Sequence, residues 1–334
     1  MSEVVVDSHT GVKAGSVTGT EEIRTLVVSR KELIADDVVL LEFADPDGGD
    51  LTAWEPGAHI DLLLPGDMSR QYSLCGDVAN RRVWQVAVLR EPEGRGGSIY
   101  LHDELAAGAS IRIRGPRNNF AFDKAGSYIF VAGGIGVTPM LPMIAAAESA
   151  GASWELVYGG RTKSSMSFVD HLTSTYGERV SIRPQDEFGL LDLPGLLGTV
   201  RGDTAVYCCG PEPLLQAIEN ACEPWPAGSL HLERFSPKAL EEPLLAESFE
   251  VECQMSDKTI TVPPGKSIVD VMQENDIPIV VSCQEGTCGS CETVILAGTP
   301  EHRDSILTPA EREANETMMV CVSRALTPRL TLEI

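Results

Sequence analysis

The sequence predicts a multidomain chain: an antiparallel β-barrel, a doubly wound α/β domain and a smaller α+β domain. Three observations predict this order. Short alternating strands separated by Gly-, Pro- and Asp-rich turns occupy residues 23–123. Strands then alternate with helices over residues 124–235, which is typical of a parallel sheet covered by helices. A hairpin, a helix and a cysteine-rich loop follow in residues 249–334.

Two segments lie outside these domains. Residues 1–22 are polar and rich in small side chains, so we expect a flexible tail. They lack the basic start and the apolar core of a signal peptide. Residues 236–248 carry two prolines and show no clear periodicity, and we expect an interdomain linker there.

Each domain has its own pattern of elements. The predicted barrel strands are "IRTLVVS", "VVLLEF", "HIDLLL", "RQYSLCG", "VWQVAVLR" and "SIRIRG", with one short helix, "IYLHDEL". The α/β domain alternates the strands "YIFVAG", "WELVYGG", "RVSIRPQ" and "TAVYCCG" with helices such as "PMLPMIAAAESA" and "PEPLLQAIENAC". The last domain is expected to begin with a hairpin of "FEVECQ" and "TITVPPG", followed by the helix "SIVDVMQEND".

Composition limits the possible functions. The chain carries 26 Lys and Arg against 49 Asp and Glu, a formal net charge of −23. This balance argues against nucleic acid as a partner and favours docking on basic protein surfaces. No apolar run reaches the length of a membrane span, so we expect a cytoplasmic protein without membrane contact. Nine cysteines, an odd number in a reducing compartment, argue against a disulfide framework.

The cysteine loop is the most specific signal. "SCQEGTCGSCE" separates Cys283, Cys288 and Cys291 by four and two residues, and Cys321 follows alone further along the chain. This is the spacing of plant-type 2Fe-2S proteins. The zinc alternative usually requires two closely spaced cysteine pairs. The sequence therefore predicts that these four thiolates hold a 2Fe-2S cluster.

The residues between these cysteines suit a cluster. Gly286 and Gly289 let the backbone approach the sulfur atoms, while Thr287 and Ser290 add hydroxyl donors. Such donors stabilise the net negative charge that four thiolates leave on a cluster. The cysteines outside the pattern are expected to be small buried side chains: Cys75, Cys208, Cys222 and Cys253.

A glycine-rich loop, "VAGGIGVTPM", follows a strand and opens a helix in the α/β domain. Gly134 and Gly136 permit a tight turn, Thr138 is the predicted N-cap and Pro139 the first helical residue. The free N–H groups and the helix dipole then suit a pyrophosphate. Because Pro139 replaces the third glycine of the ordinary dinucleotide fingerprint, a turn that only packs tightly stays open as an alternative.

The barrel carries a basic and aromatic motif. In "SRQYSLCG", Arg70 and Tyr72 share one face of a strand and Ser73 points to the other. Arginine suits a phosphate and tyrosine suits a planar cofactor, although a surface arginine and a core tyrosine would give the same pattern. In "EGRGGSIYLHDEL", Gly97 precedes Ser98, the predicted N-cap of a helix that offers a second phosphate site.

Taken together, the motifs "RQYSLCG", "GRGGS", "GGIGVTPM", "CCGPEPL", "HLERF" and "SCQEGTCGSC…C" resemble the phthalate dioxygenase reductase family, within the ferredoxin–NADP reductase superfamily. The resemblance covers nearly the whole chain beyond the tail. It implies a flavin-binding barrel, a nicotinamide-binding α/β domain and a C-terminal plant-type ferredoxin domain with a β-grasp fold.

The resemblance also implies site residues around a flavin, for which the family uses FMN. It places the FMN phosphate at Arg70, Gly97 and Ser98. It places the isoalloxazine ring against Tyr72, Ser73 and Phe235. The short turn "GRGGS" fits FMN better than FAD, and an FAD-containing reductase stays open as an alternative.

The resemblance further implies an NADH site along Gly134, Gly136, Thr138 and Pro139. Cys209 would lie near the reactive carbon of the nicotinamide, so Cys209 and Ser73 are the predicted catalytic residues. Arg161 also suits the ribose phosphate of NADPH, whereas the family favours NADH.

The implied cofactors predict a function. NADH gives two electrons as a hydride, a 2Fe-2S cluster takes one, and a flavin converts between them. We therefore expect a reductase component that passes electrons from NADH through FMN and the cluster to a terminal Rieske oxygenase, of the aromatic dioxygenase or O-demethylase type. The alternatives are the same relay serving a haem-thiolate monooxygenase and a zinc-stabilised nucleotide-binding regulator without turnover.

The charge of the last domain suggests how the partner binds. Residues 247–334 hold 15 Asp or Glu against 6 Lys or Arg. We expect this acidic domain to dock on a basic patch of the oxygenase, although a solvated acidic surface would have the same composition.

Overall fold

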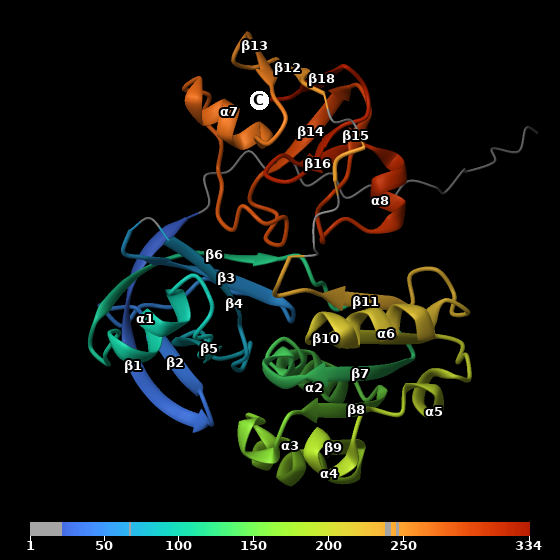
Figure 1. Ribbon diagram of the computed structural model, residues 1–334. Helices are drawn as coiled ribbons and strands as arrows, with labels where there is room; N and C mark the ends of the chain where they lie inside the picture. The colour runs from blue at the N-terminus through green and yellow to red at the C-terminus, as the bar shows by residue number, and fades with distance from the viewer. Residues whose placement is uncertain (1–21, 67, 238–241, 245–246) are drawn as a thin grey trace, which may run out of the picture.

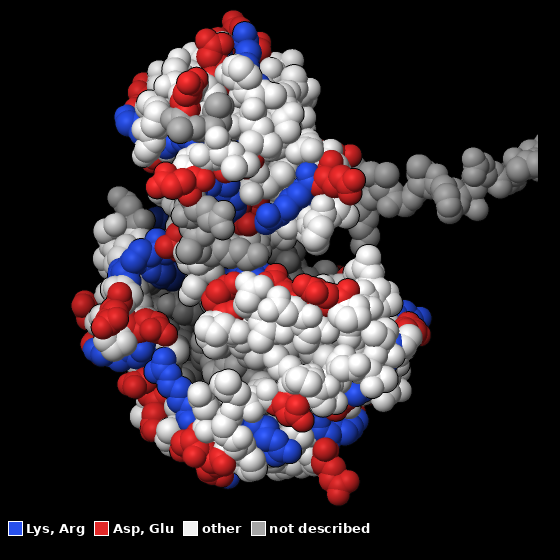
Figure 2. Space-filling model, turned by 45° about the vertical axis from the view of Figure 1, so that its right-hand side comes forward, with Lys and Arg blue, Asp and Glu red and all other residues white. Residues whose placement is uncertain are grey.

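The computed structural model describes residues 22–66, 68–237, 242–244 and 247–334. Three domains meet around a central region, with the barrel and the α/β domain below and the third domain above them (Figure 1). Acidic side chains are spread over all three domains on the face that Figure 2 shows. The predicted tail, apart from Glu22, and part of the predicted linker lie outside the described residues.

The first domain is the predicted antiparallel barrel. Its strands pair in the order β4-β3-β6-β1-β2-β5, and a bridge between Leu74 and Val86 joins the two ends. Apolar side chains such as Phe43 and Ile60 fill the inside. The elements are β1 (Ile23–Ala35), β2 (Val38–Ala44), β3 (Ala58–Leu64), β4 (Met68–Ser73), β5 (Val83–Leu89), α1 (Gly97–Asp103) and β6 (Ser110–Asn118).

The second domain is a parallel sheet of order β11-β10-β7-β8-β9. On the central strand, Phe130 packs into the core beneath α2 and Val131 into the core beneath α6, so helices cover both faces as predicted. The strands are β7 (Ser127–Gly133), β8 (Ser153–Gly160), β9 (Val180–Pro184), β10 (Thr204–Cys209) and β11 (Leu230–Glu233). The helices are η1 (Gly134–Val137), α2 (Met140–Ser149), η2 (Lys163–Ser165), α3 (Val169–Tyr176), η3 (Gly177–Arg179), α4 (Gln185–Phe188), α5 (Leu193–Leu197) and α6 (Glu212–Cys222).

The third domain is a mixed sheet of order β13-β12-β18-β14-β16 with α7 packed on one face, the β-grasp arrangement. The predicted hairpin is present, and β18 runs parallel to its first strand. The cysteine loop connects α7 to β14 and points toward the barrel (Figure 1). The elements are β12 (Phe249–Cys253), β13 (Lys258–Val262), α7 (Ile268–Glu274), β14 (Glu292–Ala297), β15 (Pro300–Glu301), α8 (Pro309–Ala314), β16 (Thr317–Met319), β17 (Arg324–Ala325) and β18 (Arg329–Leu332).

Strand β3 shows how the third domain packs on the barrel. Ile60 and Leu62 point into the barrel core and are fully buried. His59 and Asp61 alternate with them and point outward, where a barrel strand usually meets water. Nevertheless His59 is only 5% exposed and Asp61 is 0% exposed. The third domain therefore covers this outer face of the barrel.

The predicted helix starts in two motifs are wrong. Gly96, not Ser98, caps α1, because its φ of 81° is a left-handed conformation that favours glycine. After β7 the chain enters η1 at once, so helical turns begin before Thr138, whose hydroxyl donates to the Ile135 carbonyl at 3.0 Å. Pro139 consequently takes the cap position of α2 rather than the first helical position.

Candidate functional site

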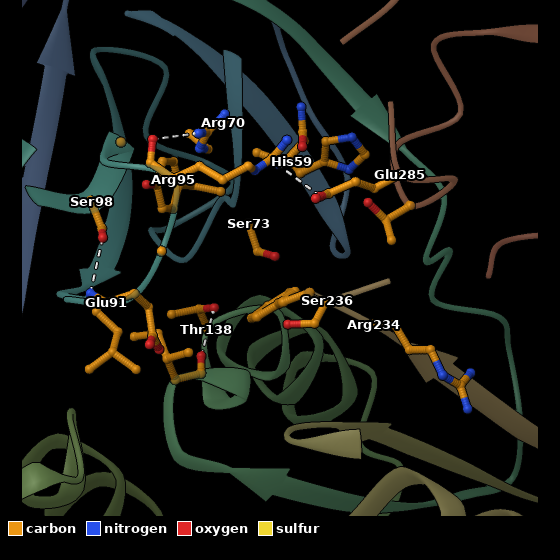
Figure 3. A pocket seen from close by; sticks show the side chains of 18 of the residues that line it. His59, Arg70, Ser73, Glu91, Arg95, Ser98, Thr138, Arg234, Ser236 and Glu285 are labelled. Carbon is orange, nitrogen blue, oxygen red and sulfur yellow. Dashed lines mark hydrogen bonds and ion pairs between the residues drawn. The ribbon is translucent and has the colours of Figure 1, made fainter. Parts of the chain in front are cut away.

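A cleft of about 450 Å³ opens where the three domains meet (Figure 3). The barrel, the segment from η1 to Thr138, the end of β11 with the residues after it, and the cysteine loop all contribute to its wall. It brings together seven predicted site residues that lie far apart in the sequence: Arg70, Tyr72, Ser73, Gly97, Ser98, Thr138 and Phe235. Four other predicted site residues do not line the cleft: Gly134, Gly136, Pro139 and Cys209.

The barrel end of the cleft is suited to an anion. Helix α1 starts at Gly97 without a side-chain cap, so the N–H groups of its first turn point outward without a capping partner. Arg70 crosses this helix start and donates to the Arg95 carbonyl at 3.0 Å. A Cβ atom at Gly97 would lie 2.6 Å from Cγ of Arg70, so glycine leaves the room for this crossing. Backbone N–H groups beside a guanidinium are well suited to a phosphate.

Ser73 and Glu233 meet at the junction of the barrel and the α/β domain. The Ser73 hydroxyl donates to Oε2 of Glu233 at 3.3 Å. Burial raises the pKa of Glu233 to about 8, and its hydrogen bonds with Ser73 and Cys209 oppose this rise. The carboxyl of Glu233 therefore holds a proton at neutral pH, next to the Ser73 hydroxyl in the cleft. Glu233 belongs to the motif "HLERF", which assigns it no role, but its position at the carboxyl end of a parallel strand is the usual place for ligand contacts.

The glycine loop and Cys209 form a packed unit behind the cleft. Gly134 has a φ of 55°, and a Cβ atom at Gly136 would lie 2.3 Å from the Cys209 carbonyl oxygen. Glycine thus lets η1 approach the end of β10 closely. Cys209 is fully buried, which raises the pKa of its thiol, and it reaches the cleft through its hydrogen bond with Glu233. Thr138 carries the loop to the cleft wall.

Aromatic rings stand on both sides of the cleft. Tyr72 lines the barrel side, and burial raises the pKa of its hydroxyl. Phe235 follows β11 on the α/β side and is 43% exposed. An exposed ring beside a cleft offers a surface for a planar ligand. The cleft therefore combines an anion site with aromatic walls, and these residues fit a flavin with a phosphate tail.

The four predicted ligand cysteines come together in the third domain. Cys283 contacts the thiols of Cys288 and Cys321, and Cys291 contacts Cys321. All four are at most 7% exposed. The Glu285 N–H donates to Sγ of Cys283 at 3.2 Å, and these contacts lower the pKa of Cys283. Buried thiols with N–H donors are the environment that thiolate ligands need.

The two glycines of the cysteine loop pack closely against side chains of other segments. Gly286 and Gly289 have φ values of 70° and 75°. A Cβ atom at Gly286 would lie 2.6 Å from a methyl carbon of Val322, and one at Gly289 would lie 2.7 Å from Nδ2 of Asn119. The loop can therefore fold tightly around the thiols and also press against the barrel.

Hydroxyl groups also lie at the thiols, as the sequence predicts. Ser290 Oγ is 3.4 Å from Sγ of Cys288, and the Thr287 hydroxyl bonds to Cys283. A 2Fe-2S cluster divides four thiolates between two irons, so four neighbouring thiols with these donors fit the cluster.

Arg95 and His59, to which the sequence assigns no role, lie between the cleft and the cysteine loop. Arg95 donates to Glu285 at 2.8 Å (Figure 3). His59 lines the cleft, and burial together with the charge of Arg117 lowers its pKa to about 4, so the imidazole is neutral. Glu285 and Thr287 of the loop line the same cleft. The flavin-type site and the cluster-type site therefore share a wall.

Comparison with known proteins agrees with this geometry. Residues 25–122 match the oxidoreductase FAD-binding domain model, and residues 251–326 match the 2Fe-2S iron–sulfur cluster binding domain model. The chain is 41% identical to phenoxybenzoate dioxygenase subunit beta of Ectopseudomonas oleovorans, over 90% of this chain and 94% of that protein.

A solved structure of phthalate dioxygenase reductase matches with a TM-score of 0.69 and 35% identity, covering 93% of this chain and 98% of that one. The chain belongs to the phthalate dioxygenase reductase family. An intact type IV self-sufficient cytochrome P450 monooxygenase also matches, with a TM-score of 0.88 and 44% identity. That match covers 93% of this chain and 41% of the cytochrome P450 chain, so this chain spans about two fifths of its length.

Membership of the phthalate dioxygenase reductase family confirms the predicted fold, enzyme class and type of cofactor. The chain is an NADH-dependent oxidoreductase with a flavin and a 2Fe-2S cluster, and it serves as an oxygenase reductase. None of the described helices has the length and apolar character that a membrane span requires.

Proposed function

We propose that this chain passes electrons from NADH through FMN and a 2Fe-2S cluster to a terminal Rieske oxygenase. The observation that carries the proposal is the shared wall of the two sites. Glu285 and Thr287, from the cysteine loop, line the same cleft as Arg70 and Tyr72. A flavin held there lies next to the cluster loop, so no mobile carrier is needed between them.

FMN is the flavin that we propose for the cleft. Arg70 and the start of α1 supply one phosphate site. Next to this site, Arg95 is held by its ion pair with Glu285, which joins the phosphate turn to the third domain. FMN ends at its phosphate and fits such a closed end better than FAD, whose adenosine must continue beyond it.

Each site residue then has a role of its own. When bound, the flavin accepts a hydride equivalent and supplies electrons one at a time. Arg70 and the first turn of α1 hold the phosphate, while Tyr72 and Phe235 border the ring. Ser73 and Glu233 both line the cleft, and the Ser73 hydroxyl donates to Glu233, whose carboxyl holds a proton near neutral pH. The buried thiol of Cys209 forms a hydrogen bond with the Glu233 carboxyl and thereby helps to position it.

Anaerobic titration of the purified protein with NADH tests the relay. The expected result is bleaching of the flavin absorbance followed by bleaching of the cluster absorbance, with iron and acid-labile sulfide present in equal amounts. Mass spectrometry of the acid-released flavin tests FMN separately. Failure of NADH to reduce either group overturns the relay, whereas release of FAD overturns only the choice of flavin.

A haem-thiolate acceptor is a second candidate, and one observation supports it. The cytochrome P450 monooxygenase named above contains a segment that is 44% identical to this chain. Reconstitution of the reduced protein with a Rieske oxygenase and, in parallel, with a haem-thiolate monooxygenase separates the two acceptors. The acceptor that turns over at the higher kcat/KM is the partner class.

We propose the third domain as the docking surface and the cytoplasm as the location. The support for docking is the composition of residues 247–334, which hold 15 acidic side chains and 6 basic ones. Opposite charges steer encounter, so electron transfer to the partner should slow as salt is raised. A salt-independent rate would overturn electrostatic docking.

The support for the cytoplasm as the location is that all nine cysteines are free of disulfide bonds.

A further inference from the structure

We propose that Asp61 is a positioning residue that docks the cysteine loop on the barrel and thereby sets the rate of electron transfer from flavin to cluster. The inference rests on the proposed relay, but it concerns a contact outside both cofactor sites. Asp61 lies on the outer face of β3, where alternate residues would normally meet water.

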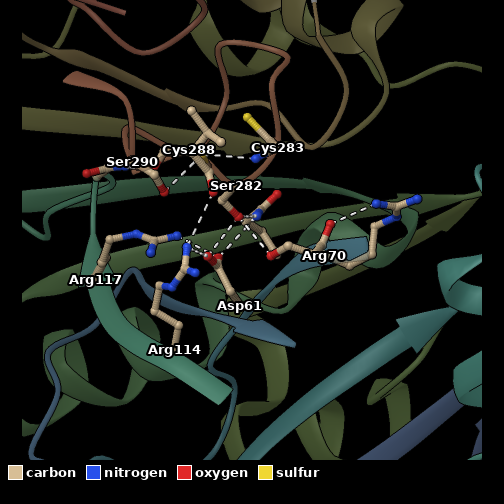
Figure 4. Close-up of polar contacts among 12 residues, drawn as sticks. Asp61, Arg70, Arg114, Arg117, Ser282, Cys283, Cys288 and Ser290 are labelled. Carbon is tan, nitrogen blue, oxygen red and sulfur yellow. Dashed lines mark hydrogen bonds and ion pairs between the residues drawn. The ribbon is translucent and has the colours of Figure 1, made fainter. Parts of the chain in front are cut away.

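The burial of Asp61 is the first observation. Its side chain is 0% exposed, and a buried carboxylate is costly unless charged and hydrogen-bonding partners surround it. The barrel supplies Arg117 at 2.5 Å, Arg114 at 3.8 Å and the amide of Gln71 at 3.1 Å. These partners satisfy one side of the carboxylate and leave it oriented toward the third domain (Figure 4).

The partner of Asp61 in the third domain is the second observation. Ser282 donates from its hydroxyl to Oδ2 of Asp61 at 2.8 Å. The same hydroxyl lies 2.8 Å from the Ser69 hydroxyl and accepts from the Gln71 amide at 2.6 Å. Ser282 directly precedes the cluster ligand Cys283 in the chain. Side chains of the barrel therefore hold the cysteine loop one residue away from a ligand.

The charges beneath the loop are the third observation. Arg114 and Arg117 are only 17% and 12% exposed, and Arg114 also donates to the Val281 carbonyl at 3.5 Å. The two guanidinium groups bring positive charge close to the loop. Positive charge near the loop favours the net negative charge of a thiolate-bound cluster. Asp61 keeps the two guanidinium groups close together, because without it they would repel each other.

The other polar contacts between the loop and the barrel are weaker. The Arg95–Glu285 pair has side chains 50% and 30% exposed, and surface pairs of this kind contribute little. Arg95 also donates to the Cys283 carbonyl, but at 3.4 Å and from a half-exposed side chain. Asn119 donates to the Cys288 carbonyl at 2.9 Å, a single neutral hydrogen bond. The buried charged contact at Asp61 is consequently the strongest element of the docking.

Docking controls transfer because the flavin site and the cluster loop belong to different domains. Electrons pass efficiently only when the two domains are docked, so the observed rate scales with the docked fraction. Loss of one hydrogen bond to a charged group lowers such a docking equilibrium on the order of tenfold. Hydride transfer from NADH involves the cleft alone and should not change.

The test compares Ser282→Ala and Asp61→Asn with wild-type holoenzyme, and Asp103→Asn is the matched control. Asp103 pairs with Arg90 on the barrel surface, at 2.7 Å, and has no partner in the third domain among its described contacts. Anaerobic stopped-flow absorbance separates flavin reduction by NADH from the later reduction of the cluster. Hydrogen–deuterium exchange of residues 282–291, measured without NADH, reports the docking itself.

Both variants should reduce the cluster more slowly, by up to about tenfold, at an unchanged rate of flavin reduction. They should also exchange amide hydrogens of the loop faster, with normal iron and flavin content. Wild-type cluster reduction and exchange in Ser282→Ala would overturn the proposal, even if Asp61→Asn failed to fold. Because the exchange measurement needs no turnover, a failure of the relay itself remains distinguishable from a failure of the docking proposal.

Discussion

The cysteine loop and the cleft are built in different ways. The loop takes three of its four thiols from nine consecutive residues, and its donors come from the same stretch. The cleft draws on distant segments, among them the residues around Arg70, Gly97, Thr138 and Phe235. Loss of one thiol should therefore destroy the cluster, whereas loss of one cleft residue should weaken binding by a limited factor.

The largest effect is expected for Cys288→Ser. Because one iron would lose a thiolate, the cluster should be absent or strongly depleted and reduction of any oxygenase should cease. NADH should still reduce the flavin, since the cleft keeps all of its binding side chains. Iron analysis and anaerobic spectra measure both results. Cys222→Ser, in the α/β domain, is the control, and equal iron loss there would contradict a specific role for Cys288.

The next effect is expected for Arg70→Ala. The variant loses the guanidinium at the anion site and should bind FMN 10- to 100-fold more weakly, as expected for the loss of a charged hydrogen bond. Fluorescence titration of the flavin-free protein with FMN measures the dissociation constant. Arg82→Ala removes an exposed arginine of the same barrel, paired with Asp50, and should leave the constant unchanged. Equal affinities in both variants would remove Arg70 from the phosphate site.

A smaller effect is expected for Gly97→Ala. Its Cβ atom would lie 2.6 Å from Cγ of Arg70 and would displace the arginine rather than remove it. FMN affinity should fall about tenfold, the equivalent of one weakened hydrogen bond. Gly202→Ala is the control, since a Cβ atom there meets nothing within 4 Å. Unchanged affinity in Gly97→Ala would show that the crossing of Arg70 is not needed for binding.

The last prediction concerns stability rather than cofactor content or affinity: Glu233→Gln should change the pH profile of stability. Burial raises the pKa of Glu233 to about 8, above the value of about 4.3 in an unfolded chain. Between these values the folded state keeps a proton that the unfolded state loses. Wild-type stability should thus fall by at most about 1.4 kcal/mol per pH unit relative to the variant, and level off above pH 8.

Denaturant unfolding of the two proteins, measured side by side from pH 5 to pH 9, tests this linkage. The free-energy difference between the variant and the wild type should grow with pH and then become constant. Parallel pH profiles would mean that Glu233 titrates normally. That result would also remove the reason to place a proton beside Ser73.

The comparison also explains which features the sequence could predict. The spacing of Cys283, Cys288 and Cys291 is a local property of the chain, and so is the alternation that predicts the barrel and the parallel sheet. Arg95 and Glu233 belong to the motifs "GRGGS" and "HLERF", but their contacts with Glu285 and Ser73 form only when domains meet, so the motifs alone assign them no role. His59 belongs to an ordinary strand pattern until the third domain covers it.

Some missed features did have a local signal. Helix α8 is absent from the predicted elements, although Thr308 and Glu311 form a capping box and Pro309 opens the helix. Serine is a common cap and therefore predicts Ser98 as the cap of α1, whereas the left-handed conformation of Gly96 places the helix start there. The residue at which a helix starts depends on the backbone conformation, and residue preferences predict that conformation only in part.

The polar interface between the outer face of β3 and the third domain implies that the third domain can be separated from the other two. Asp61, Arg114 and Arg117 can be hydrated when the third domain is absent. An apolar interface in the same place would instead expose a hydrophobic patch that favours aggregation. A shortened chain that stops before Phe249 should accordingly stay soluble and fold by itself. Another ferredoxin domain could then be attached to the barrel and α/β domains by changing only the few polar side chains at this interface.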